Sequence, residues 1–106
     1  MARVLAVVPD LMLSSKVSAM LGAAGHEVSV VSKTPSSDSF EADLIVCDLE
    51  AVDPGEVASL PAPAIGFYSH VDIDTRDRGR EAGLDLVVPR SRMARELPEL
   101  AARLLA

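Results

Sequence analysis

Five short polar segments, each following a run of apolar residues, hold the side chains with which this chain could do chemistry. They are residues 9–10, 32–33, 48–50, 69–71 and 89–92. In open α/β sheets, ligands bind beyond the carboxyl ends of the strands. If the apolar runs are parallel strands, the carboxylates of Asp10 and Asp48, the hydroxyl of Ser69 and the guanidinium of Arg90 meet on one rim. Carboxylates can hold a divalent cation, and an arginine can pair with a carboxylate or a phosphate.

Predicted strands and predicted helices alternate along the chain, and together they must position the rim residues. Apolar runs rich in β-branched residues predict strands over 3–8, 26–32, 43–48, 64–68 and 85–88. Helical spacing or helix-starting residues predict helices between Asp10 and Gly25, after Asp53, over 72–82 and in the last segment, which includes Met93, Leu97 and Leu100. Residues 33–39, with Pro35 among serines, are expected to be irregular or only briefly helical. Such alternation is typical of βα units that wind a parallel sheet.

Composition sets the class of the protein. The chain has 106 residues, of which 49% are apolar, so we expect one domain over 1–106 with a packed core. The net charge of −6 argues against nucleic acid as a ligand. The apolar runs are far shorter than the roughly 18 residues of a membrane span, and Cys47 is the only cysteine. We therefore expect a cytoplasmic protein that neither crosses a membrane nor contains a disulfide.

Four segments resemble the strand ends of response-regulator receiver domains, the family of the chemotaxis regulators. They read RVLAVVPD (3–10), ADLIVCDL (42–49), YSH (68–70) and AGLDLVVPR (82–90). The resemblance spans nearly the whole chain and implies a flavodoxin-like (βα)5 three-layer sandwich with a five-stranded parallel sheet in the order 2-1-3-4-5. It places Asp48 at the phosphoacceptor position and Ser69 at the hydroxyl position that follows the phosphate on activation.

The departures from the receiver pattern concern the phosphorylation chemistry. The acidic pair that holds Mg²⁺ in typical receivers aligns with Val8 and Pro9, so that only the neighbouring Asp10 remains. The family's lysine aligns with Arg90, which we expect to form an ion pair with Asp48 or Asp10. The aromatic switch position aligns with Val87. The resemblance is therefore to an atypical receiver, or pseudo-receiver.

Each candidate residue also has a plainer interpretation. Asp48 could cap a turn, Asp10 could cap the first helix and Ser69 could be an ordinary turn residue. His70 lies on the expected rim, where an exposed loop histidine is the alternative to a contact or pH-sensing role. Cys47, inside an apolar strand, is expected to act as a small hydrophobic residue.

Basic residues cluster in the last third of the chain. Arginines at 76 and 80 lie one helical turn apart, and those at 90, 92 and 95 follow. The carboxylates of Asp72 and Asp74 are spaced to pair with arginines one turn later, which would give a solvated helix face. As a candidate interface, Arg76, Arg80, Arg92 and Arg95 would form one basic face over helix 72–82, the fifth strand and the last helix.

The sequence leads to one interpretation with two rivals. The first is a stand-alone, non-enzymatic signalling domain that acts through protein–protein contact, with no obligatory cofactor and no metal site. Its partner would be another protein or a second copy docked on the basic face. In the first rival, a working phosphorelay receiver, a histidine kinase phosphorylates Asp48, with Mg²⁺ held by Asp10 and Asp48. In the second, the fold binds a small molecule, although no glycine-rich loop follows the first strand.

Overall fold

The computed structural model describes residues 1–69 and 71–106 as alternating strands and helices. The elements in chain order are β1 (Arg3–Val7), α1 (Leu11–Ala23), β2 (Glu27–Val31), a 3₁₀ turn η1 (Ser37–Ser39), β3 (Leu44–Asp48), α2 (Pro54–Ala58), β4 (Ala64–Tyr68), α3 (Ile73–Glu81), β5 (Leu86–Pro89) and α4 (Arg90–Leu105). Every predicted strand is present. Only β5 extends past its predicted range, by one residue to Pro89.

The strands form one parallel sheet in the order β2-β1-β3-β4-β5. This order confirms the flavodoxin-like topology expected from the sequence. All five residues of β3 and all five of β4 are buried, as expected for central strands covered on both faces. The carboxyl ends of β1, β3 and β4 therefore meet at one rim, where the polar segments of the sequence follow them.

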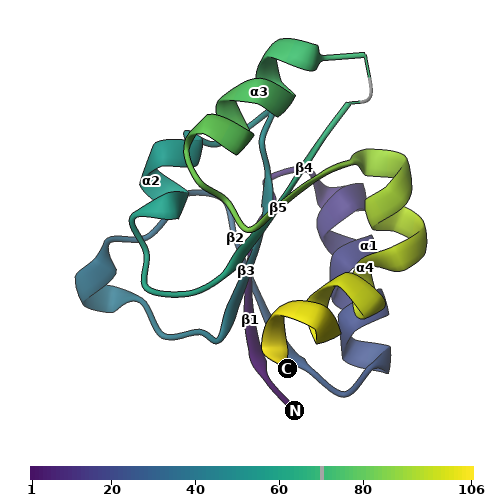
Figure 1. Ribbon diagram of the computed structural model, residues 1–106. Coiled ribbons are helices and arrows are strands. Elements are labelled where there is room, and N and C mark those ends of the chain that lie inside the picture. The colour runs from purple at the N-terminus through teal and green to yellow at the C-terminus, as the bar shows by residue number, and fades with distance from the viewer. Residues whose placement is uncertain (70) are drawn as a thin grey trace.

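Helices cover both faces of the sheet and give three layers (Figure 1). The helices α1 and α4 pack on one face, where Leu21 of α1 and Leu97 of α4 share a core with Phe67 of β4. The short α2 and α3 cover the other face (Figure 1), where Val57 and Leu60 pack with Ile45. The apolar stripes recognised in the first and last helices are thus the faces that meet the sheet.

The second βα unit differs from the others. Between β2 and β3 the chain forms only η1 and loops, which confirms the expectation of an irregular or briefly helical segment over 33–39. Pro35 and the surrounding serines explain this, because proline lacks an N–H and serine side chains compete for backbone hydrogen bonds. Ser39, for example, donates its hydroxyl to the Ser36 carbonyl at 3.3 Å.

Aspartates begin three of the helices. Asp10, Asp53 and Asp72 each accept a hydrogen bond from a backbone N–H in the first turn, from Leu13, Gly55 and Thr75 respectively. These bonds satisfy donors that have no partner inside the helix. After α1, Gly25 takes the left-handed conformation with φ at 91°, which a side chain would disfavour. No helix in the described part of the chain is long and apolar enough to cross a membrane.

Two glycines allow the loop after β3 to pack closely on the sheet and on α3. A Cβ atom on Gly66 of β4 would lie 2.8 Å from Cγ of Leu49, and one on Gly79 of α3 would lie 2.8 Å from its Cδ1. Leu49 is only 3% exposed. It follows directly after Asp48, so this packing fixes the start of the loop that carries the rim carboxylates.

Candidate functional site

Asp48 is the last residue of β3 and lies at the carboxyl-end rim of the sheet. The residue is 5% exposed, and its Oδ1 accepts a hydrogen bond of 3.0 Å from the backbone N–H of Glu50. Its backbone carbonyl accepts bonds of 2.9 Å from Ala51 and 3.2 Å from Val52. The carboxylate therefore caps the turn in which it lies, the plainer of the two roles considered for it.

Asp10 lies at the exposed start of α1. Its Oδ1 accepts a 2.9 Å hydrogen bond from Leu13 N–H, so Asp10 is the helix cap expected from the sequence. The residues before it offer no ligand atoms from their side chains. Val8 is 1% exposed and belongs to the core, and Pro9 follows it.

Ser69 and Arg90 border a common hollow. This hollow has a volume of about 390 Å³ and lies between the start of α4, the first half of α1 and Ser69 after β4. Its lining comprises Leu13, Lys16, Ser69, Arg90, Ser91 and Ala94. Neither Asp48 nor Asp10 lines it. The structure thus brings the hydroxyl and the guanidinium together, beside the amine of Lys16, and leaves both carboxylates outside.

The prediction that Arg90 forms an ion pair with Asp48 or Asp10 is wrong. No salt bridge to Arg90 occurs within the described residues, and its Nε is buried without a hydrogen-bond partner. Both carboxylates instead accept backbone hydrogen bonds from residues close in the sequence, Asp48 from Glu50 N–H and Asp10 from Leu13 N–H. The physical reason is position, because Arg90 begins α4 and lines the hollow beside Ser69, which neither Asp48 nor Asp10 borders.

Glu50 is the rim residue that the sequence did not single out. Its Oε1 accepts a 3.0 Å hydrogen bond from Ser69 N–H, which links the loop after β3 to the loop after β4. The Ser69 carbonyl in turn accepts a 2.8 Å bond from Asp72 N–H. The position of Glu50 in the polar segment after β3 indicated that it lies on the rim. Nothing in the sequence indicated that its side chain would bond to the Ser69 N–H.

Asp72 continues this chain of contacts at the start of α3. Its side chain accepts hydrogen bonds from the Thr75 hydroxyl at 2.6 Å and the Thr75 N–H at 3.1 Å. These two bonds lower the pKa of Asp72, and a hydrogen bond shared with the Glu50 side chain contributes in the same direction. The carboxylate is therefore ionised as it caps α3.

Cys47 lies beneath the rim in β3 and is fully buried. Burial, with a smaller contribution from the charge of Asp48, raises the pKa of its thiol to about 12. The thiol is protonated at neutral pH, which suits the hydrophobic role predicted for it.

The arginines of the expected basic face are mostly paired within their own helices. In α3, Arg76 pairs with Asp77 at 3.1 Å, and not with Asp72. In α4, Arg92 pairs with Glu96 at 3.4 Å, and Arg95 lies 3.9 Å from the same glutamate. The helices α3 and α4 flank β5 at the edge of the sheet (Figure 1). The fourth arginine of the candidate interface, Arg80, is exposed on α3.

Two further observations bear on the expected site. His70 lies outside the described residues, so its predicted place on the rim stays a prediction. In residues 1–69 and 71–106 there is no group of three or more histidine, cysteine, aspartate or glutamate side chains that could hold a metal ion. The rim offers fewer side-chain ligands for Mg²⁺ than the receiver pattern, because Val8 and Pro9 supply no side-chain oxygen at the positions of the acidic pair.

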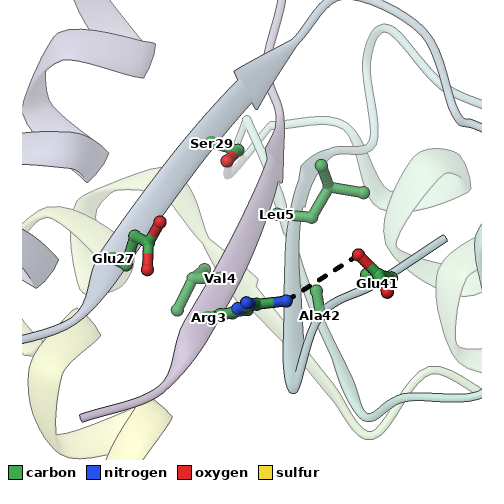
Figure 2. A pocket seen from close by; sticks show the side chains of 7 residues that line it. All are labelled: Arg3, Val4, Leu5, Glu27, Ser29, Glu41 and Ala42. Carbon is green, nitrogen blue, oxygen red and sulfur yellow. Dashed lines mark ion pairs between the residues drawn. The ribbon is translucent and has the colours of Figure 1, made fainter.

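A second hollow, of about 190 Å³, lies at the amino ends of β1 and β2, away from the rim. Figure 2 shows Glu27 and Ser29 of β2 on one side of it and Leu5 of β1 beside them, with Arg3 directed toward Glu41. The ion pair between Arg3 and Glu41 measures 3.8 Å and is exposed. This hollow borders the segment that holds η1 in place of a helix.

Comparison of the structure with solved structures finds receiver domains. A putative response regulator from Chloroflexus aurantiacus superposes with a TM-score of 0.83 and 20% identity, over 98% of this chain and 97% of that one. The chemotaxis response regulator CheY4 of Vibrio cholerae gives 0.82 and 19%, over 99% of both chains. NtrX from Brucella abortus gives 0.82 and 19% over 98% of this chain, which spans only 26% of NtrX.

Comparison at the level of sequence finds no such match. No protein-family model and no curated protein sequence matches the chain. At 19 to 20% identity the structural likeness shows the fold, which is that of response-regulator receivers. It carries no statement about phosphorylation in this chain.

Proposed function

We propose that this chain is a receiver-like signalling domain that acts through protein–protein contact and without Mg²⁺-dependent phosphorylation. The observation that carries the proposal is the state of the Asp48 carboxylate. It is 5% exposed and accepts a hydrogen bond from Glu50 N–H, while the first strand ends in Val8 and Pro9. An acceptor aspartate needs a metal ion beside it to compensate the charge on the transferring phosphoryl group.

The contacts around the rim support a fixed arrangement. Ser69 is tied by its backbone N–H to Glu50 and by its carbonyl to Asp72 N–H. These bonds hold the loops after β3 and β4 together with protein groups alone. A domain of this kind presents a constant surface to its partner and does not need a phosphoryl group to assemble it.

The partner surface of this proposal is the arginine face over α3, β5 and α4. Arg80 is exposed there, and Arg95 is 71% exposed with its nearest carboxylate at 3.9 Å. Guanidinium groups form paired hydrogen bonds with carboxylates, so an acidic segment of another protein fits this face. The proposal includes no catalysis and no cofactor.

A working phosphorelay receiver is the second candidate, and the hollow beside Ser69 favours it. Lys16 and Arg90 supply positive charge there, and Ser69 and Ser91 supply hydroxyls, a combination suited to an anion. A phosphoryl group on Asp48 would have to reach this hollow after the carboxylate left its bond with Glu50. This candidate requires Mg²⁺ at the rim, whereas the first candidate does not.

Titration with Mg²⁺ distinguishes the two candidates. Amide NMR spectra of the protein would be recorded from zero to about tenfold above physiological Mg²⁺, with Ca²⁺ and an Asp48→Asn variant as controls. The proposal predicts no saturable shift at Asp10, Asp48 or Glu50. A saturable shift at these residues that the Asp48→Asn variant loses would favour the phosphorelay receiver.

A further inference from the structure

The outer edge of β2 is an unpaired edge of the described sheet. This strand pairs with β1 on one side, and no strand of the described chain pairs with its other side. The opposite edge strand, β5, has only four residues and ends in Pro89, which lacks a donor. Exposed edges invite pairing with another strand, and proteins commonly block them with proline, lysine or bulges. Residues 27–31 contain none of these.

The hydrogen bonds of β2 show which of its groups are free. Glu27 donates its N–H to the carbonyl of Ala2, just before β1, at 2.9 Å, and the Val31 carbonyl accepts from the N–H of Val8, just after β1, at 3.1 Å. Since the N–H and C=O of one strand residue point the same way and alternate along the strand, Glu27, Ser29 and Val31 face β1. Val28 and Val30 therefore direct their N–H and C=O groups away from β1, and Val30 as a residue is 45% exposed.

We propose that the β2 edge pairs antiparallel with the β2 edge of a second copy of this chain, joining two sheets into one. The two-fold axis passes between the two Ser29 residues. Val28 of each copy then lies opposite Val30 of the other, and each such pair exchanges two hydrogen bonds between the outward-facing groups. The register uses every residue of the strand and leaves the bonds to β1 intact.

The sequence of this edge is complementary to itself. Cross-strand pairs of Val28 and Val30 place apolar side chains opposite one another on the α1 side of the sheet, where Val28 already packs against the core. Glu27 begins the strand and Lys33 follows its end, and both are exposed. In the antiparallel pairing, Lys33 of one copy lies diagonal to Glu27 of the other, within reach of long side chains. Opposite charges at both ends thus favour a second copy over an unrelated strand.

The missing helix of the second βα unit leaves room on the other side of the edge. Glu27 and Ser29 border the hollow shown in Figure 2, which no helix covers. Ser29 is exposed there, so its side chain can approach that of the second copy. The pairing also places the arginine faces at the two outer ends of the joined sheet, because β5 lies at the opposite edge from β2.

A cysteine at the two-fold axis tests the pairing directly. Opposed residues that do not share hydrogen bonds have Cα atoms about 4.5 Å apart, within the roughly 4.4 to 6.8 Å spanned by disulfides. We expect Ser29→Cys to form a covalent dimer on mild oxidation, at least tenfold faster than Ser59→Cys, an exposed control on the loop after α2. Cys47 is buried and does not compete. Equal rates for the two variants would overturn the proposal.

Sedimentation equilibrium over a concentration series provides the second measurement. Wild type is expected to dimerise, and Val30→Pro to be monomeric with an unchanged circular dichroism spectrum, because the lost N–H faces outward. Lys33→Glu should weaken the dimer at least tenfold, and adding Glu27→Lys should restore it. The pairing would be contradicted if the wild type were monomeric or if its dimer did not respond to these changes. It would also be contradicted if an extended segment of another protein, and not a second copy, paired with β2.

Discussion

The Oε1 atom of Glu50 accepts a hydrogen bond of 3.0 Å from the backbone N–H of Ser69. This bond joins the loops that follow β3 and β4, and Asp48 lies two residues before Glu50. The backbone N–H of Glu50 in turn donates to the Asp48 carboxylate at 3.0 Å. One glutamate therefore holds both the acceptor-like aspartate and the switch-like serine in the positions that the structure shows.

Glu50→Ala should loosen the rim and lower the stability only slightly. A net hydrogen bond is worth about 0.5 to 1.5 kcal/mol, and this one is exposed, so we expect a loss at the lower end of that range in the free energy of unfolding. Faster hydrogen exchange at the Ser69 amide would report the lost bond. Glu50→Gln keeps an acceptor oxygen and should retain most of the protection, whereas equal exchange in all three proteins would contradict the assigned role.

Arg90→Met should leave the stability unchanged or raise it. The Nε atom of Arg90 is buried and has no hydrogen-bond partner among residues 1–69 and 71–106, and an unsatisfied buried donor costs about 1 to 3 kcal/mol. Methionine keeps much of the aliphatic length and has no donor. Urea unfolding measures the change. A loss of more than about 1 kcal/mol would mean that Arg90 has a partner, as the sequence had suggested.

Gly66→Ala should destabilise the fold because the added methyl group meets Leu49. The new Cβ would lie 2.8 Å from Leu49 Cγ, and overpacking costs about 1 to 3 kcal/mol. Leu49→Ala in the same chain should remove part of this cost, so that the double variant is more stable than the sum of the single changes predicts. Gly22→Ala in α1 is the matched control, since nothing lies within 4 Å of its new Cβ.

The sequence predicted the fold more completely than the site. Hydrophobic spacing predicted every strand and which face of α1 and α4 meets the sheet, because burial is a property of a residue's own type and of its near neighbours. The caps at Asp10 and Asp53 were predicted because aspartate accepts backbone hydrogen bonds at helix starts, whereas Asp72 was expected to pair with an arginine and caps α3 instead. The segment with Pro35 was correctly expected to lack a regular helix, although the open β2 edge beside it was not foreseen.

The partners of rim side chains could not be predicted from the sequence. Asp48 and Arg90 lie at the ends of β3 and β5, and opposite charges at one rim suggested a pair. The structure shows otherwise, because Asp48 accepts a hydrogen bond from the Glu50 amide and Arg90 lines the hollow beside Ser69. Similarly, Arg76 forms its ion pair with Asp77 and not with Asp72, whose carboxylate accepts a hydrogen bond from the Thr75 hydroxyl. Which of several nearby acceptors a side chain contacts depends on side-chain geometry, and the spacing of residues in the sequence does not determine that geometry.

Cys47 should resist alkylation in the folded protein. Burial raises the pKa of its thiol to about 12, so almost no thiolate is present at pH 8. We expect iodoacetamide to label the native protein at least a hundredfold more slowly than the protein in urea, as followed by intact mass. Rapid labelling of the native state would show that β3 opens readily and would contradict the buried position of the thiol.

Intact-mass measurement with a small-molecule phosphodonor tests the central claim most directly. The protein would be incubated with Mg²⁺ and acetyl phosphate beside an Asp48→Ala variant, and a conventional receiver would serve as the positive control. The account predicts that the conventional receiver gains the mass of one phosphoryl group, while this protein and its variant gain none. A gain in the wild type that the Asp48→Ala variant loses would contradict the account and establish Asp48 as a working phosphoacceptor.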